Sequence, residues 1–304
     1  MPASETLSAR LETHVSPLVA LAVAVLAVST SAILIRWSTA PPTVAAFYRV
    51  LVTVGLLAPL AFSRHGEHLR ELGRQDAMAA SATGLALAAH FAAWFQSVEW
   101  TSVAASVTLV QAQPLFVAAG AWALLDERLG ARKLGGILVA LAGMAAMSAG
   151  ELLGGALVGP RPLAGNALAV VGAVMMATYL LAGRSLRARI PLIPYVTVVY
   201  AICAVALGGF AAVQGHRLLG YAPVEWLLFL GMAVGPGVFG HTVINWALEH
   251  VESSVVSVTL LGEPVGSTVL AVVLLAETPG VPTVAGGAVV LAGIYVTARA
   301  QETE

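Results

Sequence analysis

The sequence predicts an all-α polytopic membrane protein, with ten transmembrane helices arranged as two inverted five-helix repeats. Three observations predict this fold class. Hydrophobic residues make up 59% of the chain and charged residues only 10%, whereas soluble domains contain about 45–50% and about 25%. The apolar runs are long enough for a helix to cross a bilayer core, which takes about 20 residues. The second half of the chain also repeats the first at an offset of about 150 residues.

The apolar runs define ten predicted spans. In order, they cover residues 17–36, 43–63, 77–98, 102–124, 133–150, 163–183, 193–213, 224–247, 254–275 and 282–299. We expect a first repeat over residues 17–150 and a second over residues 163–299. A cytoplasmic tail of residues 1–16 precedes them and lacks the features of a cleaved signal peptide. No run shows the regular alternation of a membrane β-barrel, which leaves helices as the spanning structure.

The internal repeat extends to polar residues that a membrane segment normally avoids. Matched pairs include Gly84 with Gly235, His90 with His241, Ser106 with Ser257, Pro114 with Pro264, and Glu127 with Glu277. Such a match over many positions indicates a duplicated unit. Duplicated membrane units are a common architecture of transporters.

The distribution of Lys and Arg predicts the orientation of the chain. With the N-terminus inside, the cytoplasmic segments hold most of the basic residues, namely Arg10, Arg64, Arg70, Arg74, Arg128, Arg132, Lys133, Arg184, Arg187, Arg189 and Arg299. This bias predicts a multi-pass protein of the cytoplasmic membrane with both termini in the cytoplasm. Because each repeat has an odd number of spans, the second repeat must be inverted relative to the first.

Several segments resemble the drug/metabolite transporter superfamily, specifically its EamA-type repeats. They are LIRWSTAPPTVAAFYRVLV from Leu34, VEWTSVAASVTLVQAQPLF from Val98, LLDERLGARKLGGILVALAGM from Leu124 and LLGEPVGSTVLAVVLLAETP from Leu260. The resemblance covers two tandem copies and implies a carrier with a cavity between its halves. Members of this family move amino acids, nucleobases, amines, sugars or drugs, commonly outward. One departure is the sequence Gly235-Pro236-Gly237, which predicts that the second half bends more than the first.

Glu263 is the only carboxylate near the middle of a predicted span. Placing a charge there costs about 2.5–3.5 kcal/mol on insertion scales. Because burial favours the neutral form of a carboxyl group, Glu263 is a candidate for proton coupling or for binding a cationic group of a substrate. Alternatively, protonated Glu263 bonds a carbonyl group that Pro264 leaves free. Gln113 occupies the equivalent position in the first half.

Two histidines occupy the same repeat position, and each shares a helix face with a second large side chain. His90 is followed one turn later by Trp94, and His241 by Asn245. The two pairs are candidate substrate contacts, and the alternative is that each histidine is a packing donor. Neither histidine has a second ligand at metal spacing on its helix, so no metal and no other cofactor are expected.

Further candidates for substrate binding are Tyr179 and Thr259. Thr259 is expected to share the face of Glu263, whereas Tyr179 is equally an interface anchor. Gln111 and Gln113 are two residues apart and cannot both point inward on a regular helix, so Gln113 is preferred. Arg49 is expected to snorkel to the outer surface, or else to meet a substrate carboxylate. The span-end residues are expected to be interface anchors or helix-end features: Trp37, Trp226, Glu127 and Glu277.

Two features predict how the helices move and pack. Pro114 and Pro264 each remove a backbone hydrogen bond in mid-span and predict kinks. Small residues at four-residue spacing, Gly136 with Ala140 and Ala288 with Ala292, predict close packing against another helix or against a second protomer in a homodimer.

Together these features predict a secondary transporter for a small polar or amphipathic metabolite, working by alternating access and in the direction of export. The alternatives are a nutrient uptake permease of the same fold and a non-transporting membrane scaffold. The predicted partners are a small-molecule substrate and the lipid bilayer. A net charge of −1 indicates no nucleic acid. No catalytic motif of a hydrolase, phosphate-binding loop or zinc protease is present in the sequence, so an enzyme is not expected.

Overall fold

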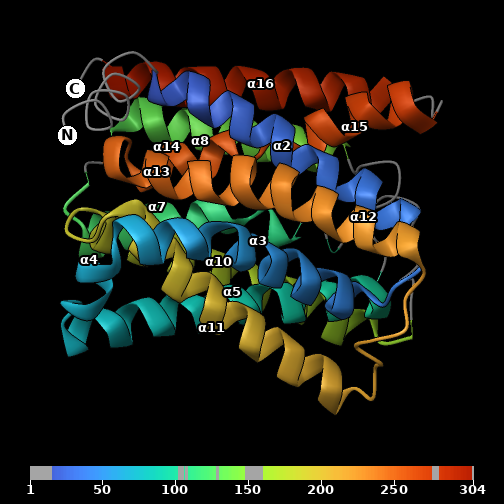
Figure 1. The fold of residues 1–304 in the computed structure, drawn as a ribbon. Coiled ribbons are helices and arrows are strands. Elements are labelled where there is room, and N and C mark those ends of the chain that lie inside the picture. Colours follow the sequence, from blue (N-terminus) through green and yellow to red (C-terminus); the bar gives the residue numbers. More distant parts are fainter. Residues whose placement is uncertain are drawn as a thin grey trace.

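The protein is described here by a computed structural model that covers residues 16–101, 106, 109–127, 130–147, 160–275 and 281–302. Every regular element within these residues is a helix (Figure 1). The predicted tail, apart from Ser16, and Glu277 lie outside them. The helices are α2 (Pro17–Trp37), α3 (Pro42–Arg64), α4 (Gly66–Arg70), α5 (Arg74–Trp100), α7 (Gln113–Leu124), α8 (Ala131–Met147), α10 (Pro162–Arg187), α11 (Leu192–Val213), α12 (Pro223–Met232), the π-helix η1 (Ala233–Thr242), α13 (Val243–His250), α14 (Ser253–Thr259), α15 (Gly262–Leu275) and α16 (Val281–Glu302).

The helices have the length and composition of membrane spans. Within the described residues, seven stretches are long and apolar enough to cross a bilayer: Pro17–Ile35, Pro42–Arg64, Arg74–Ser97, Pro162–Arg187, Leu192–Val213, Pro223–His250 and Ser253–Leu274. Two shorter apolar helices cover Gln113–Leu124 and Val284–Thr297. The all-α, multi-pass character of the chain is therefore confirmed, while the count of ten spans stays a prediction.

Helices of the first half pack against helices of the second. α5 lies against α10, α3 against α11, and α8 against α16, while α2 lies against η1 and α15. The largest apolar core contains residues from both halves, from Leu21 in α2 to Leu260 after α14. α2 begins and α16 ends at the same end of the bundle (Figure 1). The two halves therefore share one interior rather than forming separate bundles.

The expected kinks at Pro114 and Pro264 are full interruptions of the helix. A turn at Gln111 and Ala112 precedes α7, and a turn at Leu260 and Leu261 separates α14 from α15. The Leu261 N–H donates to the Val258 carbonyl at 3.0 Å, a tighter pairing than in an α-helix. Each proline then lies in the first turn of the following helix, where its missing N–H leaves no bond unmade.

The third interruption occurs in only one half. The predicted span 224–247 is an α-helix, then the ten-residue π-helix η1, then α13. η1 contains Gly235-Pro236-Gly237, the segment that departs from the repeat, whereas the matching residues 84–86 lie within the α-helix α5. Short π-helical segments often occur at functional sites. The sequence difference between the halves thus corresponds to a difference in helix type.

The small residues of α8 pack within the chain. A Cβ atom at Gly143 would lie 2.5 Å from the Val290 backbone nitrogen, and one at Gly293 would lie 2.4 Å from the Ala140 backbone nitrogen. The face of α16 predicted to pack closely carries Ala288 and Ala292, and both are exposed. A different face of α16 meets α8. The close packing predicted for the small residues of α8 is therefore made with α16 of the same chain. A homodimer stays a prediction.

Replacing Gly136 by alanine is expected to destabilise the protein by about 1–3 kcal/mol, the usual cost of overpacking. A Cβ atom there would lie 2.8 Å from the Thr297 backbone nitrogen and 2.9 Å from the Gly293 carbonyl oxygen. The neighbouring Gly135 is a matched control, because a Cβ atom there meets nothing within 4 Å. Gly135→Ala is expected to leave stability unchanged or to raise it slightly. Thermal unfolding of the two variants in detergent tests this packing, and equal unfolding temperatures would contradict it.

Candidate functional site

A cavity of about 200 Å³ lies among the helices of the two halves. It is lined by Val28, Ser31, Ile35, Arg49, His90, Phe91, Trp94, Val110, Gln111, Gln113, Met176, His241, Ile244, Leu260, Glu263, Pro264 and Ser267. A single water molecule needs only about 10–15 Å³ of such volume. The cavity is therefore large enough for an organic solute, and both repeats contribute to its wall.

The structure brings five of the eight predicted contact residues together in this cavity. His90 and Trp94 come from α5, Gln113 from the start of α7, His241 from η1 and Glu263 from the start of α15. Tyr179, Asn245 and Thr259 are not part of the lining.

Tyr179 and Asn245 support the cavity wall from behind. Asn245 Nδ2 lies within hydrogen-bond distance of the Tyr179 hydroxyl group, of the Tyr200 hydroxyl group at 3.1 Å and of the His241 carbonyl oxygen at 2.7 Å. Tyr179 is fully buried, so the alternative of an interface anchor is wrong for it. The contacts fix the part of the chain that carries His241 against α10 and α11.

Thr259 does not share the face of Glu263. Its hydroxyl group donates to the Val255 carbonyl oxygen of its own helix at 2.8 Å. The turn at Leu260 and Leu261 lies between the two residues and breaks the helical register on which the prediction depended. Thr259 is therefore a useful control position close to the cavity.

Both glutamines of the first half line the cavity. The expectation that only one of Gln111 and Gln113 points inward assumed a regular helix. Gln111 instead lies in the turn before α7, and Gln113 begins that helix. The same interruption that mirrors the one before Glu263 thus adds a second amide group to the wall.

Arg49 lies inside the protein, not at the outer surface. Its side chain is only 6% exposed, lines the cavity and places its guanidinium carbon 4.7 Å from the centre of the Phe91 ring. The prediction that Arg49 snorkels to the outer surface is therefore wrong. The depth of Arg49 along α3 was predictable from the sequence, but the direction of its side chain depends on which face of α3 packs inward.

The histidines present different atoms to the cavity. His90 Nδ1 pairs with the Gly172 carbonyl oxygen at 2.9 Å, which leaves Nε2 as the acceptor of a neutral ring. The His90 ring stacks on Trp94, with 6.1 Å between ring centres. Among the described residues, His241 Nδ1 and Trp94 Nε1 are buried without a hydrogen-bond partner. Buried polar atoms are normally paired, so these two atoms are available to water or to a solute.

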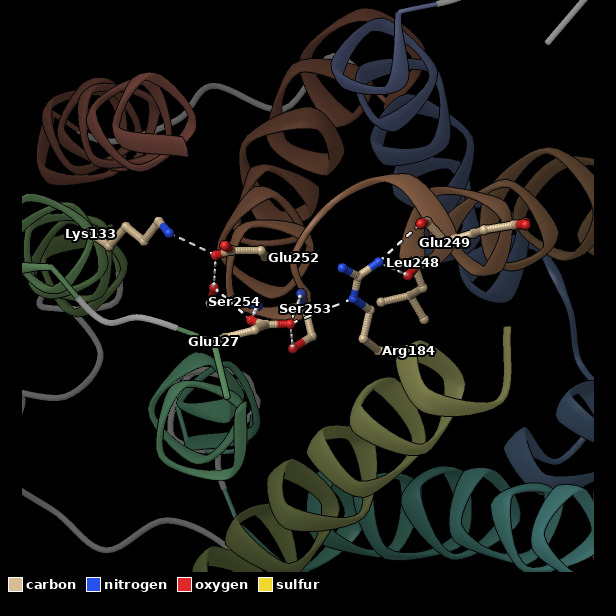
Figure 2. Close-up of polar contacts among 8 residues, drawn as sticks. All are labelled: Glu127, Lys133, Arg184, Leu248, Glu249, Glu252, Ser253 and Ser254. Atoms are coloured by element: carbon tan, nitrogen blue, oxygen red, sulfur yellow. Dashed lines mark hydrogen bonds and ion pairs between the residues drawn. The ribbon is translucent and has the colours of Figure 1, made fainter. Parts of the chain in front are cut away.

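A polar cluster joins the two halves at one end of the bundle, where α10 ends and α14 begins (Figure 2). Glu127, which follows α7, accepts hydrogen bonds from the Ser253 backbone nitrogen and hydroxyl group, both at 3.0 Å. Its other oxygen accepts from the Ser254 nitrogen at 3.4 Å and hydroxyl group at 3.2 Å. Of the two predicted roles, Glu127 has that of a helix-end feature, because it is buried and caps the start of α14 rather than anchoring the chain at the membrane interface.

Two basic residues complete this cluster. Lys133 of α8 is fully buried and forms an ion pair with Glu252 at 2.7 Å. Arg184 of α10 lies 3.7 Å from Glu127 and donates to the Leu248 carbonyl oxygen at 2.8 Å. We call Glu127, Lys133, Arg184, Glu252, Ser253 and Ser254 the inner cluster, because the topology predicted from the sequence places this end on the cytoplasmic side. Glu127 and Lys133 come from the first half and the other four residues from the second, so these contacts hold the halves together.

Contacts between the halves also occur at the opposite end. Glu225, near the start of α12, accepts hydrogen bonds from the Ser38 hydroxyl group at 2.5 Å, the Thr39 backbone nitrogen at 2.7 Å and the Thr39 hydroxyl group at 2.8 Å. We call Glu225, Ser38 and Thr39 the outer cluster, because the predicted topology places this end on the side opposite the cytoplasm. Trp226 is partly exposed beside it and packs edge-on against Tyr48. The cavity thus lies between two sets of polar contacts, one near each end of the bundle.

Apolar helices of membrane-spanning length surround a cavity whose largely apolar wall carries charged and polar side chains from both halves, which is the arrangement of a membrane transporter. Comparisons with known proteins give the same class. The chain belongs to the EamA-like transporter family, whose sequence profile matches residues 15–149 and 163–299, so two tandem repeats are confirmed.

Relatives of known sequence support the same class. An uncharacterized transporter of Archaeoglobus fulgidus is 25% identical over 259 residues, which cover 84% of this chain and 87% of the relative. A second uncharacterized transporter of the same organism is 31% identical over 200 residues, covering 66% of this chain and 68% of the relative. A solved crystal structure is similar with a TM-score of 0.78 and 22% identity, covering 95% of this chain and 98% of that one. At that identity the likeness shows the fold.

Proposed function

We propose that the protein is a secondary transporter that exports a small polar or amphipathic metabolite across the cytoplasmic membrane by alternating access. The observation that carries this proposal is the cavity, which places Arg49, Glu263 and two histidines inside an apolar bundle. Charged residues within membrane helices are costly and usually mark a substrate or ion pathway. A non-transporting scaffold would gain nothing from such a cavity.

The proposed topology is ten spans in two inverted repeats with both termini in the cytoplasm. The basic residues of the predicted inner segments, including Arg64, Arg70, Arg74 and Arg189, support this orientation. The inner cluster then faces the cytoplasm and the outer cluster faces the opposite side.

The two clusters act as gates in this proposal. Glu127 and its partners close the inner end, and Glu225 and its partners close the outer end. Alternating access requires that one set of contacts opens while the other stays formed. The turns before α7 and α15 serve as hinges, because discontinuous helices commonly surround the substrate site of transporters.

Glu263 supplies the coupling to protons in this proposal. Its carboxyl group lies in the cavity wall at the start of α15. A carboxyl group that takes up a proton when the empty cavity faces outward, and releases it when the cavity faces the cytoplasm and the substrate binds, carries one proton per cycle. Export of the substrate is then driven by protons that enter in the opposite direction.

Ligand binding is expected to raise the unfolding temperature of the purified protein. Amino acids, amines, nucleobases and sugars are added to the protein in detergent at two pH values, and unfolding is followed on heating. A ligand at 100 times its Kd stabilises the native state by about 2.7 kcal/mol. At least one class of compound should raise the unfolding temperature of the wild type and of Thr259→Val, whose side chain lies outside the cavity, but not that of His241→Ala. Stabilisation of all three proteins alike, or of none, would contradict the proposed site.

A further inference from the structure

We propose that the cavity is a binding site for a small zwitterion, in which Arg49 receives a carboxylate group and Glu263 receives a protonated amine of the same molecule. This inference rests on the proposed transport function and narrows its substrate to solutes of the α-amino-acid kind. It follows from the surroundings of the two charged residues in the cavity wall.

Arg49 forms no ion pair with the residues that the structure describes, and the carboxyl group that attracts it electrostatically is that of Glu263 in the same cavity wall. Within the described part of the chain, its guanidinium group takes part in no hydrogen bond or ion pair, and its one polar contact is with the face of the Phe91 ring. A guanidinium group presents five N–H donors in a planar fork that matches a carboxylate. Leaving such a group buried and unpaired is unfavourable. The structure therefore provides a preformed site for an anionic group.

Glu263 is in the matching position for a cation. Its backbone carbonyl accepts a hydrogen bond from the Ser29 hydroxyl group at 3.1 Å, which ties this residue to α2. Its side chain lines the cavity and takes part in no hydrogen bond or ion pair with the described residues. A carboxylate held in this way accepts hydrogen bonds from an ammonium group.

Arg49 and Glu263 line one cavity and attract each other electrostatically across it. An ion pair requires an N···O separation of at most 4.0 Å, and Arg49 and Glu263 do not form one. A solute with a single charge would pair with one of these groups and leave the other buried alone. A zwitterion pairs with both, and it also bridges the repeats because Arg49 is in α3 and Glu263 in α15.

The rest of the wall indicates the kind of side chain that the zwitterion carries. Val28, Phe91, Met176 and Ile244 supply apolar surface from four different helices. An aliphatic or thioether side chain would bury its surface there, which is favourable. The site thus fits an amino acid with a side chain of medium size and no charge.

Three matched compounds test the two charges separately. Leucine carries both charges, 3-methylbutylamine is leucine without its carboxylate, and 4-methylpentanoate is leucine without its amine. Their binding to the detergent-purified full-length protein is measured by thermal unfolding and by calorimetry, beside the common L-amino acids. The wild type should bind at least one uncharged-side-chain amino acid, and leucine more tightly than either analogue.

The variants Arg49→Gln and Glu263→Gln should separate the two contacts. Each should weaken leucine binding roughly tenfold or more, the order expected for loss of one partner of a buried charge pair. Arg49→Gln should keep its affinity for 3-methylbutylamine, and Glu263→Gln should keep its affinity for 4-methylpentanoate. These retained affinities show that each variant is folded. Thr259→Val should bind all three compounds as the wild type does.

Two results would overturn the zwitterion site. One is equal affinity of the wild type for leucine and 3-methylbutylamine, and the other is unchanged leucine binding by Arg49→Gln. Binding of nucleobases, sugars or amines without any amino acid would also overturn it while leaving the proposed transport function intact. If no compound of any class binds, both the zwitterion site and the proposed transport function are overturned.

Discussion

Replacing Glu263 by glutamine is expected to abolish proton-driven transport while leaving the protein folded. Glutamine has nearly the same size and keeps the hydrogen-bonding character of the site, but it cannot exchange a proton. Since Glu263 is the only carboxyl group in the cavity lining of the described chain, no neighbour can replace it there. Transport is measured in vesicles that contain the purified protein, with an imposed pH gradient and the strongest ligand found on thermal unfolding.

The matched control for this change is Glu249→Gln. The Glu249 carboxylate pairs with Arg187, lies 43% exposed and is outside both the cavity and the inner cluster. This variant should transport as the wild type does. If Glu263→Gln kept the rate and the pH dependence of the wild type, protons would not be carried by this residue, and the coupling mechanism proposed above would be wrong.

Replacing Glu127 by glutamine is expected to open the end of the cavity that the proposed topology places on the cytoplasmic side. The carboxylate accepts four hydrogen bonds from Ser253 and Ser254, and hydrogen bonds to a charged group are each worth about 1.5–3 kcal/mol. Glutamine has one carbonyl oxygen and turns an NH2 group toward donors that it cannot satisfy. The balance between closed and open forms should therefore shift toward the open form by roughly tenfold or more.

Cysteine labelling measures this opening directly. Cys203 is the only cysteine in the chain and is buried, so Cys203→Ser gives a background without reactive thiols. A cysteine at Ile244, in the cavity wall, should react faster with a maleimide added from the cytoplasmic side when Glu127 is replaced. Glu249→Gln is again the control and should not change the rate. Equal rates for the two glutamine variants would show that Glu127 does not hold the inner end closed.

The membrane helices were predictable because the bilayer fixes their length. The predicted runs 17–36 and 193–213 differ from α2 and α11 by one residue or less at each end. The helix breaks were less predictable. Pro114 and Pro264 show where a backbone hydrogen bond is missing, but neighbouring helices decide whether the helix bends or ends there. For the same reason Gln111 and Thr259 were placed on the wrong faces, since both predictions assumed one continuous helix.

Some residues of the site were predictable from the sequence and others were not. Glu263, His90 and His241 were visible in the sequence because polar residues in apolar runs are unusual and because two of them repeat. Arg49 was visible but misplaced, since sequence gives its depth along the helix and not the direction in which it points. The partners of Glu127 were not predictable, because Ser253 and Ser254 lie far along the chain and meet it only in the folded protein.

The difference between η1 and the matching part of α5 has a consequence for how cargo is held. Two identical halves would enclose a cavity with a twofold axis, in which an elongated molecule could lie equally well in either of two opposite directions. Here Glu263 stands where the other half has Gln113, and a π-helix stands where the other half has an α-helix. The axis is lost at the centre of the cavity. In the transport cycle proposed above, we therefore expect a molecule with two different ends to prefer one head-to-tail arrangement and to present the same end to the exit path each time.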